Sequence, residues 1–194
     1  QLLITMDGQH VQKSPFDLHV RRDYSTLCNP DQVISCSDDP TGIAIHHSGD
    51  IYVSIGAICI CVFDQAGQQK KTIGSSGSGD GQFQRPRGIF IKGDVMYVAD
   101  AGNHRIQKLT TGGQFLQTYH GSGQKQFNFP ISVIVDQRDR LIVSDYYNHR
   151  VVILDQAGTW LLTIKGNVFS FQNPYGLALD PQGNIHVAAY GSNT

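Results

Sequence analysis

The chain has 194 residues, and its 15 Lys and Arg against 16 Asp and Glu give a net charge of −1. This balance excludes the global excess of positive charge that is typical of dedicated nucleic-acid-binding proteins, but it is compatible with a local basic face. No apolar run reaches about 18 residues, so neither a transmembrane helix nor membrane contact is expected. The 21 glycines and 7 prolines fall at turns, which favours a domain of many short strands.

Residues 1–39 differ in pattern from the rest of the chain. Residues 1–20 contain two alternating strands joined by a turn, and residues 21–39 read as a linker in which residues 31–36 are a candidate strand. Because the chain begins with Gln1 rather than Met, we expect its natural N-terminus to lie upstream.

A repeat of about 45 residues begins at Pro40 and continues to the end of the chain. The four copies are expected at residues 40–85, 86–129, 130–173 and 174–194, the last being truncated, and each of the last three opening prolines follows a phenylalanine by three residues. Each copy opens with an apolar strand such as residues 88–91, and a turn and an alternating strand such as residues 94–99 follow. Two further short strands complete each full copy, which is the pattern of a β-propeller blade.

The four cysteines, Cys28, Cys36, Cys59 and Cys61, lack the C-x-x-C spacing of a zinc site. Cys59 and Cys61 would share one face of a strand, where disulfide geometry is unfavourable. We therefore expect reduced thiols and a cytoplasmic location.

The repeat carries motifs of a known family. Phe-x-x-Pro-x-Gly, then Tyr-Val-Ala-Asp, then Asn-His-Arg-Ile, as in residues 83–106, resembles the NHL repeat. The resemblance implies an all-β, typically six-bladed propeller, of which this chain would supply about 3.5 blades. The first and fourth copies lack the aspartate of the pattern, and the first also lacks Asn-His-Arg.

Residues 1–20 resemble the end of a filamin-type immunoglobulin repeat, through Gly8, Val11 and the run Ser14-Pro15-Phe16. A filamin-type domain followed by NHL repeats resembles the tripartite-motif (TRIM-NHL) proteins. That resemblance implies a substrate-recognition module of a RING E3 ubiquitin ligase that acts in proteasomal degradation, with zinc held only by RING and B-box domains upstream. The alternative is a propeller that binds single-stranded RNA and represses mRNAs. We expect no cofactor in this chain and no oligomerisation through it.

An Asp…Asn-His-Arg signature occurs twice, 45 residues apart, and invites a catalytic interpretation. A repeat rotates its copies around a ring, whereas catalysis needs groups that converge on one point. The signature residues are therefore predicted to be structural, with Arg and Asp paired, and no catalytic residue is expected, which leaves a propeller enzyme as a weak third hypothesis. They are Asp100, His104, Arg105, Asp145, His149 and Arg150.

The loops that join the second and third strands should share a face with the loops that enter the first strands, and loops on a rigid scaffold commonly carry recognition. Aromatic rings beside arginines suit protein hot spots and also stacked single-stranded bases. For Phe129 the competing interpretation is a ring that seals a blade interface. The predicted partner-binding residues are Arg85, Arg87, Asn103, Phe129, Tyr146, Tyr147, Asn148 and Tyr175.

Three other motifs are interpreted as structural. His46 and His47 are adjacent and are expected on opposite faces of a strand, so no metal site is predicted. The run GSSGSGDG at residues 74–81 lacks the GK[ST] ending of a phosphate loop and is interpreted as a flexible turn. The run HSGD at residues 47–50 is interpreted as a turn between strands.

Overall fold

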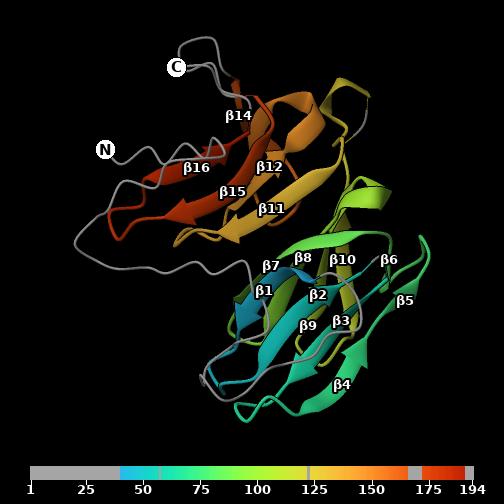
Figure 1. Cartoon of the computed structure of the whole chain (residues 1–194). Coiled ribbons are helices and arrows are strands. Elements are labelled where there is room, and N and C mark those ends of the chain that lie inside the picture. The colour runs from blue at the N-terminus through green and yellow to red at the C-terminus, as the bar shows by residue number, and fades with distance from the viewer. Residues whose placement is uncertain (1–39, 57, 122, 166–171, 191–194) are drawn as a thin grey trace.

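A computed structural model describes residues 40–56, 58–121, 123–165 and 172–190 of the chain (Figure 1). Within these ranges the chain forms antiparallel sheets and three short 3-10 turns, with no α-helix. None of the described helices is long and apolar enough to cross a membrane. The predicted filamin-type remnant at residues 1–20 and the linker at residues 21–39 lie outside the described residues.

Each antiparallel sheet follows the order of its strands along the chain. The first sheet contains β1 (Pro40–Ile45), β2 (Ile51–Ile55), β3 (Cys59–Phe63) and β4 (Gln69–Ile73). The second contains β7 (Pro86–Lys92), β8 (Val95–Asp100), β9 (Arg105–Thr110) and β10 (Phe115–Tyr119). The third contains β11 (Pro130–Val135), β12 (Leu141–Asp145), β13 (Arg150–Leu154) and β14 (Trp160–Lys165). The fourth contains β15 (Pro174–Leu179) and β16 (Ile185–Ala189). The 3-10 turns are η1 (Ala101–Asn103), η2 (Gly123–Lys125) and η3 (Tyr146–Asn148).

The repeat prolines mark the first residue of the first strand in each sheet. Proline lacks a backbone N–H, so it is tolerated at the start of a strand but not in its interior. Pro86 pairs with Asp100 and Pro130 with Asp145, the last residues of β8 and β12. The proline therefore places the start of each of these blades directly opposite the signature aspartate.

The first strands of successive sheets lie beside one another, β1 next to β7 and β7 next to β11, with β15 beyond β11 (Figure 1). Apolar side chains fill the space between neighbouring sheets. Tyr52 and Val62 of the first sheet pack with Met96 of the second, and Tyr97 of the second packs with Val143 of the third. The facing surfaces of neighbouring sheets thus share an apolar core, as expected for propeller blades.

Glycine and serine residues allow the first strands to approach closely. A Cβ on Gly88 would lie 2.7 Å from the Ile131 carbonyl oxygen in the next blade, so this position requires a residue without a side chain. The Ser54 hydroxyl donates to the Arg87 carbonyl at 2.7 Å, and the Ser144 hydroxyl donates to the Tyr175 carbonyl at 2.9 Å. These hydrogen bonds tie the second strand of one blade to the first strand of the next.

The loop at residues 74–81, predicted to be a flexible turn, is instead anchored. β5 (Ser75–Ser76) pairs in parallel with β6 (Gln82–Phe83), and carbonyl groups of the loop accept side-chain hydrogen bonds from Asn103 and Arg105. The glycine content suggested a flexible loop, but the carbonyl groups of residues 77–79 are held by side chains of the blade.

Replacing Gly88 with Ala should destabilise the protein by about 1–3 kcal/mol, the usual range for overpacking. The free energy of unfolding, measured by urea denaturation, checks this expectation. Gly176→Ala is the matched control, because Gly176 occupies the same place in its repeat and its added Cβ would lie 3.7 Å from Ala188 Cβ, an ordinary contact. Equal losses in the two variants would contradict the requirement for close approach.

Candidate partner-binding face

Two Asp–Arg pairs occupy equivalent places where β8 and β12 end. Arg105 Nε donates to Asp100 Oδ2 at 2.8 Å, and Arg150 Nε donates to Asp145 Oδ2 at 2.6 Å. Both aspartate side chains are 0% exposed and both arginine side chains are 6% exposed. A charge this deeply buried is tolerated only when it is paired and hydrogen-bonded, so each member depends on the other.

The same pairs fasten the loop that leads into the first strand of the blade. The terminal nitrogens of Arg105 donate to three carbonyl oxygens in residues 78–82, and those of Arg150 donate to two in residues 124–126. The second carboxylate oxygen of each aspartate accepts a backbone N–H from that loop at 2.7 Å. Because both carboxylates are inaccessible and fully engaged, the arrangement suits architecture and offers no general base.

The signature histidines join one blade to the next. His104 Nδ1 accepts the backbone N–H of Phe129 at 3.0 Å, and His149 Nδ1 accepts that of Asn173 at 3.1 Å. Both accepting histidines and both donating residues have positive φ values between 50° and 60°, which is uncommon outside glycine. The hydrogen bond therefore holds a strained residue immediately before the proline of the following blade.

Four aromatic rings and one arginine form a continuous patch on the face made by these loops. Arg87 lies 5.7 Å above the ring of Phe129, whose centroid is 5.4 Å from that of Tyr147. The ring centroid of Tyr146 lies 4.9 Å from that of Tyr147 and 6.3 Å from that of Tyr175, and both pairs are edge-to-face. We call these five residues the aromatic patch.

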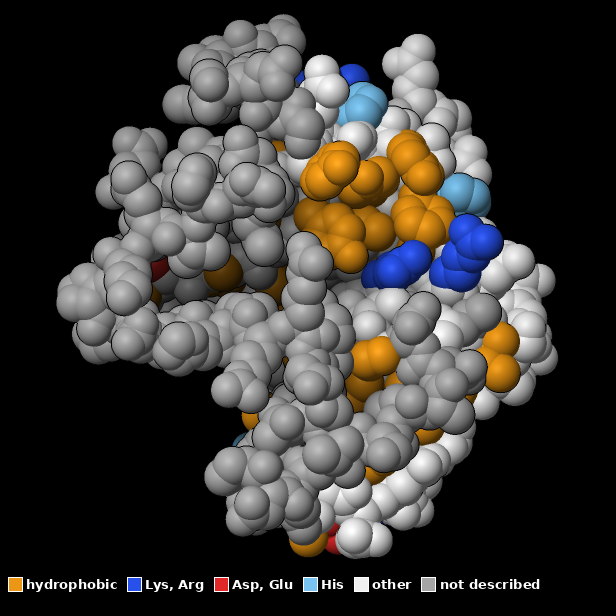
Figure 2. All heavy atoms as spheres, viewed as in Figure 1, with side chains coloured by type: hydrophobic (Ala, Val, Ile, Leu, Met, Phe, Trp, Pro, Cys, Tyr) orange, Lys and Arg blue, Asp and Glu red, His pale blue; other side chains and the backbone are white. Residues whose placement is uncertain are grey.

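The aromatic patch is open to solvent. Tyr147 is 55% exposed and Tyr175 is 47% exposed. Figure 2 shows hydrophobic side chains gathered on one face with Lys or Arg side chains along their border, and no acidic side chain of the described residues is visible beside them. Exposed aromatic rings grouped in this way make this face a candidate interaction surface.

Tyr190 belongs to the same neighbourhood, although the sequence interpretation did not include it. Burial raises the pKa of Tyr146, and the nearby Tyr147, Tyr190 and Tyr175 raise it further. Tyr190 is 67% exposed and follows β16 directly, as Tyr146 follows β12. Tyr146 and Tyr190 are separated by one repeat in the sequence, and this spacing could have indicated that Tyr190 lies near the patch.

The other predicted partner-binding residues lie near the patch in different roles. Arg85 is exposed and has a φ of 52° just before Pro86. The amide nitrogens of Asn103 and Asn148 donate to the signature aspartates Asp100 and Asp145 at 2.8 and 2.9 Å. These two amide nitrogens therefore support the loops, whereas Arg85 is free to reach a partner.

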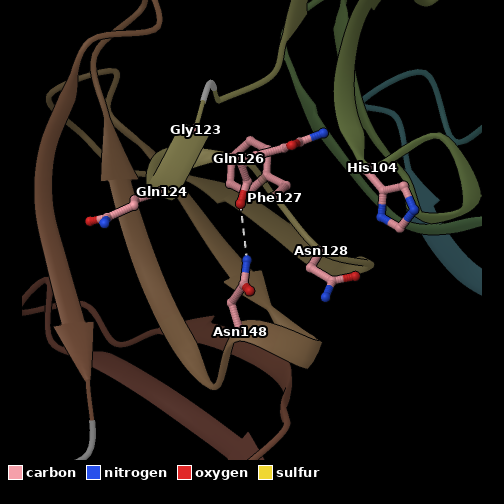
Figure 3. Close-up of a pocket in the computed structure, with 7 residues that line it drawn as sticks. All are labelled: His104, Gly123, Gln124, Gln126, Phe127, Asn128 and Asn148. Carbon is pink, nitrogen blue, oxygen red and sulfur yellow. Dashed lines mark hydrogen bonds between the residues drawn. The ribbon is translucent and has the colours of Figure 1, made fainter.

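A polar cavity of about 340 Å³ lies on this face between the second and third blades (Figure 3). Amide side chains of Gln124 and Asn128 surround it with Asn148, whose amide donates to the Gln126 carbonyl at 2.9 Å. His104 of the preceding blade closes the other end (Figure 3). The cavity presents hydrogen-bonding groups rather than charge.

Asp145→Ala should lower the free energy of unfolding by about 3–5 kcal/mol, because it leaves Arg150 buried without a counter-charge. Urea unfolding followed through Trp160 checks this, since Trp160 is the chain's single tryptophan and lies 4.7 Å from the Arg150 guanidinium. As a control, Lys92→Ala removes an exposed ion pair with Asp139 and should cost about 1 kcal/mol or less. A loss for Asp145→Ala as small as that of the control would refute the structural role.

Comparison with protein families finds the NHL repeat at residues 127–154. The chain is 31% identical over 127 residues to Protein brain tumor from Drosophila melanogaster, a match covering 63% of this chain and 12% of that protein. It is also 31% identical over 115 residues to NHL repeat-containing protein 3 from Homo sapiens, covering 56% of this chain and 33% of that protein. RING finger protein nhl-1 from Caenorhabditis elegans is 33% identical over 127 residues, a match covering 62% of this chain and 13% of that protein. The chain thus spans a third or less of these relatives.

Solved structures show the same architecture. A catalytically inactive virginiamycin B lyase from Staphylococcus aureus, solved with quinupristin, superposes with a TM-score of 0.64 at 18% identity over 87% of this chain and 53% of that one. A streptogramin B lyase gives a TM-score of 0.61 at 16% identity, over 80% of this chain and 50% of that one. At these identities the likeness shows the fold alone. The predicted all-β architecture is confirmed: the chain is a β-propeller that contains an NHL repeat.

Proposed function

We propose that this propeller is the partner-recognition module of a TRIM-NHL type ubiquitin ligase. The observation that carries the proposal is the aromatic patch, in which Arg87 lies beside a row of rings that includes the exposed Tyr147 and Tyr175. Buried aromatic and arginine anchors dominate the energy of protein interfaces. The relative from Caenorhabditis elegans that is named for a RING finger supports a ligase context, in which a RING upstream recruits the conjugating enzyme.

The patch is suited to recognition because it is rigid and composite. Arg87 comes from β7, Tyr146 and Tyr147 from η3, and Tyr175 from β15, so three successive blades contribute to it. The buried Asp–Arg pairs fix the loops beneath, which limits the conformational entropy lost on binding. A protein segment with exposed carboxylates and apolar side chains would complement this surface.

Tyr147→Ala and Arg87→Ala should each weaken binding of a protein substrate about tenfold or more, because Tyr147 contacts two other rings of the patch and Arg87 supplies its positive charge. The measurement is quantitative co-precipitation from cells that express the full-length protein, followed by ubiquitination assays on each protein whose capture depends on the patch. Leu161→Ala is the control, since Leu161 is 51% exposed but lies on the outer strand β14. Capture and ubiquitination that are unchanged in both patch variants would contradict the proposal.

Single-stranded RNA is the second candidate partner, favoured by arginine beside exposed rings and by the amide-lined cavity next to them. Rings can stack on bases, amides can read base edges, and arginines can contact phosphates. Binding of labelled random single-stranded RNA, followed by fluorescence anisotropy, should then fall steeply as salt rises and should be lost in Arg87→Ala. Absence of binding at low salt would eliminate this candidate and leave the protein-recognition role.

A further inference from the structure

Two turns from neighbouring blades bring two imidazoles and a carboxylate together, away from the aromatic patch. His46 and His47 follow β1, and Asp94 lies in the turn between β7 and β8. One potential ligand atom from each residue lies within 4.8 Å of the others, and His46 Nε2 is 3.2 Å from Asp94 Oδ1. The two imidazole rings are 3.9 Å apart, which corrects the expectation that they face opposite sides of a strand. The strand ends at Ile45, so strand alternation does not extend to them.

The repeat shows that the turn itself does not require histidine. Asp136 and Asp180 occupy the position of His46 in the third and fourth blades, and each carboxylate accepts two backbone N–H groups of its turn at 2.8–3.0 Å. Hydrogen bonds from the Asn184 side chain and from the turn backbone lower the pKa of Asp180 to about 2. His46 accepts one backbone N–H, from Ser48, at 3.3 Å. A carboxylate caps this turn with more hydrogen bonds, so the turn itself does not require the imidazole of His46.

The surroundings of His46 suit a metal ligand. Its side chain is 10% exposed, and its Nδ1 lies 2.7 Å from the Ser48 hydroxyl. Where that hydroxyl accepts from Nδ1–H, the Nε2 lone pair is free to bind a metal, and the long backbone contact from Ser48 at 3.3 Å is given up. Such a second contact, on the ring nitrogen that faces away from the metal, is characteristic of ligating histidines. The nearby carboxylate of Asp50 forms an ion pair with Lys70 at 2.8 Å instead of pairing with the histidines.

Other pairs in the chain show what sets this cluster apart. Lys92 and Asp139 join the second and third blades by a plain ion pair of 2.6 Å, and His186 pairs with Asp180 at 3.3 Å. Neither pair is part of a three-ligand group among the described residues, whereas His46 has His47 beside it. Two imidazoles and one carboxylate match the donor set and ligand number that zinc takes when a fourth position is left to water.

We propose that His46, His47 and Asp94 bind one divalent transition-metal ion of the zinc class, which clips the first blade to the second. Imidazole nitrogen and carboxylate oxygen favour Zn²⁺ over the oxygen-seeking Mg²⁺ and Ca²⁺. The ion would bridge turns that the fold already holds together, so its binding stabilises the folded state.

The test uses the full chain, freed of metal by chelation and titrated with Zn²⁺ against a chromogenic zinc indicator. One equivalent should bind, and the thermal midpoint should rise on saturation. His47→Ala and Asp94→Asn should each weaken this site at least tenfold and remove most of the thermal shift, since each lacks one ligand. Circular dichroism verifies that both variants fold. His186→Ala is the matched control and should bind zinc as the unaltered chain does, because it removes a histidine of a plain His–Asp pair.

Cobalt(II) substitution reports the ligands directly. A tetrahedral spectrum without a thiolate charge-transfer band, abolished by His47→Ala, supports the proposal. A thiolate band would place the metal on cysteine instead and would overturn it. Equal zinc affinity in His47→Ala and the unaltered chain, or no zinc-dependent thermal shift, would show that His46 and Asp94 form only an ion pair between blades.

Discussion

The buried Asp–Arg pair is the interaction on which the candidate partner-binding face depends. It links the end of a blade's second strand to the loop that enters its first strand, so two segments distant in sequence are fixed by one charge pair. In the low dielectric of the interior neither charge is tolerated alone, which makes the arrangement nearly all-or-none. Tyr146 and Tyr147 lie in η3 directly after Asp145, so this pair sets the position of their backbone.

The architecture could be predicted from the sequence because it repeats. Proline at the first position of each sheet, an apolar strand after it and glycine at close approaches follow from backbone sterics, and they recur at one spacing. The grouping of Arg87, Phe129, Tyr147 and Tyr175 also followed from placing equivalent loops on one face. The fold of a repeat protein is encoded locally, many times over.

Features that occur in only one blade could not be predicted from the repeat. Gln107 is fully buried and donates to the Gln82 carbonyl at 2.6 Å and to Asp100 at 3.1 Å, yet the equivalent position in the next blade is Val152. The proximity of His46 to His47 depends on where β1 stops, a matter of one residue. Such details are decided by tertiary packing, which a single copy of a motif cannot reveal.

The histidines that clamp the residues before Pro130 and Pro174 have an evolutionary consequence. Because His104 holds Phe129 through its backbone N–H, the side chain at position 129 is displayed by a scaffold that does not depend on its identity. Arg85, Phe129 and Asn173 all occupy this place with the same backbone twist and very different chemistry. Binding preference can therefore diversify at these sites by single substitutions while the ring stays intact. An exchange of whole repeats between related propellers should place its junction at the repeat proline, because His104 and Phe129 are then transferred together.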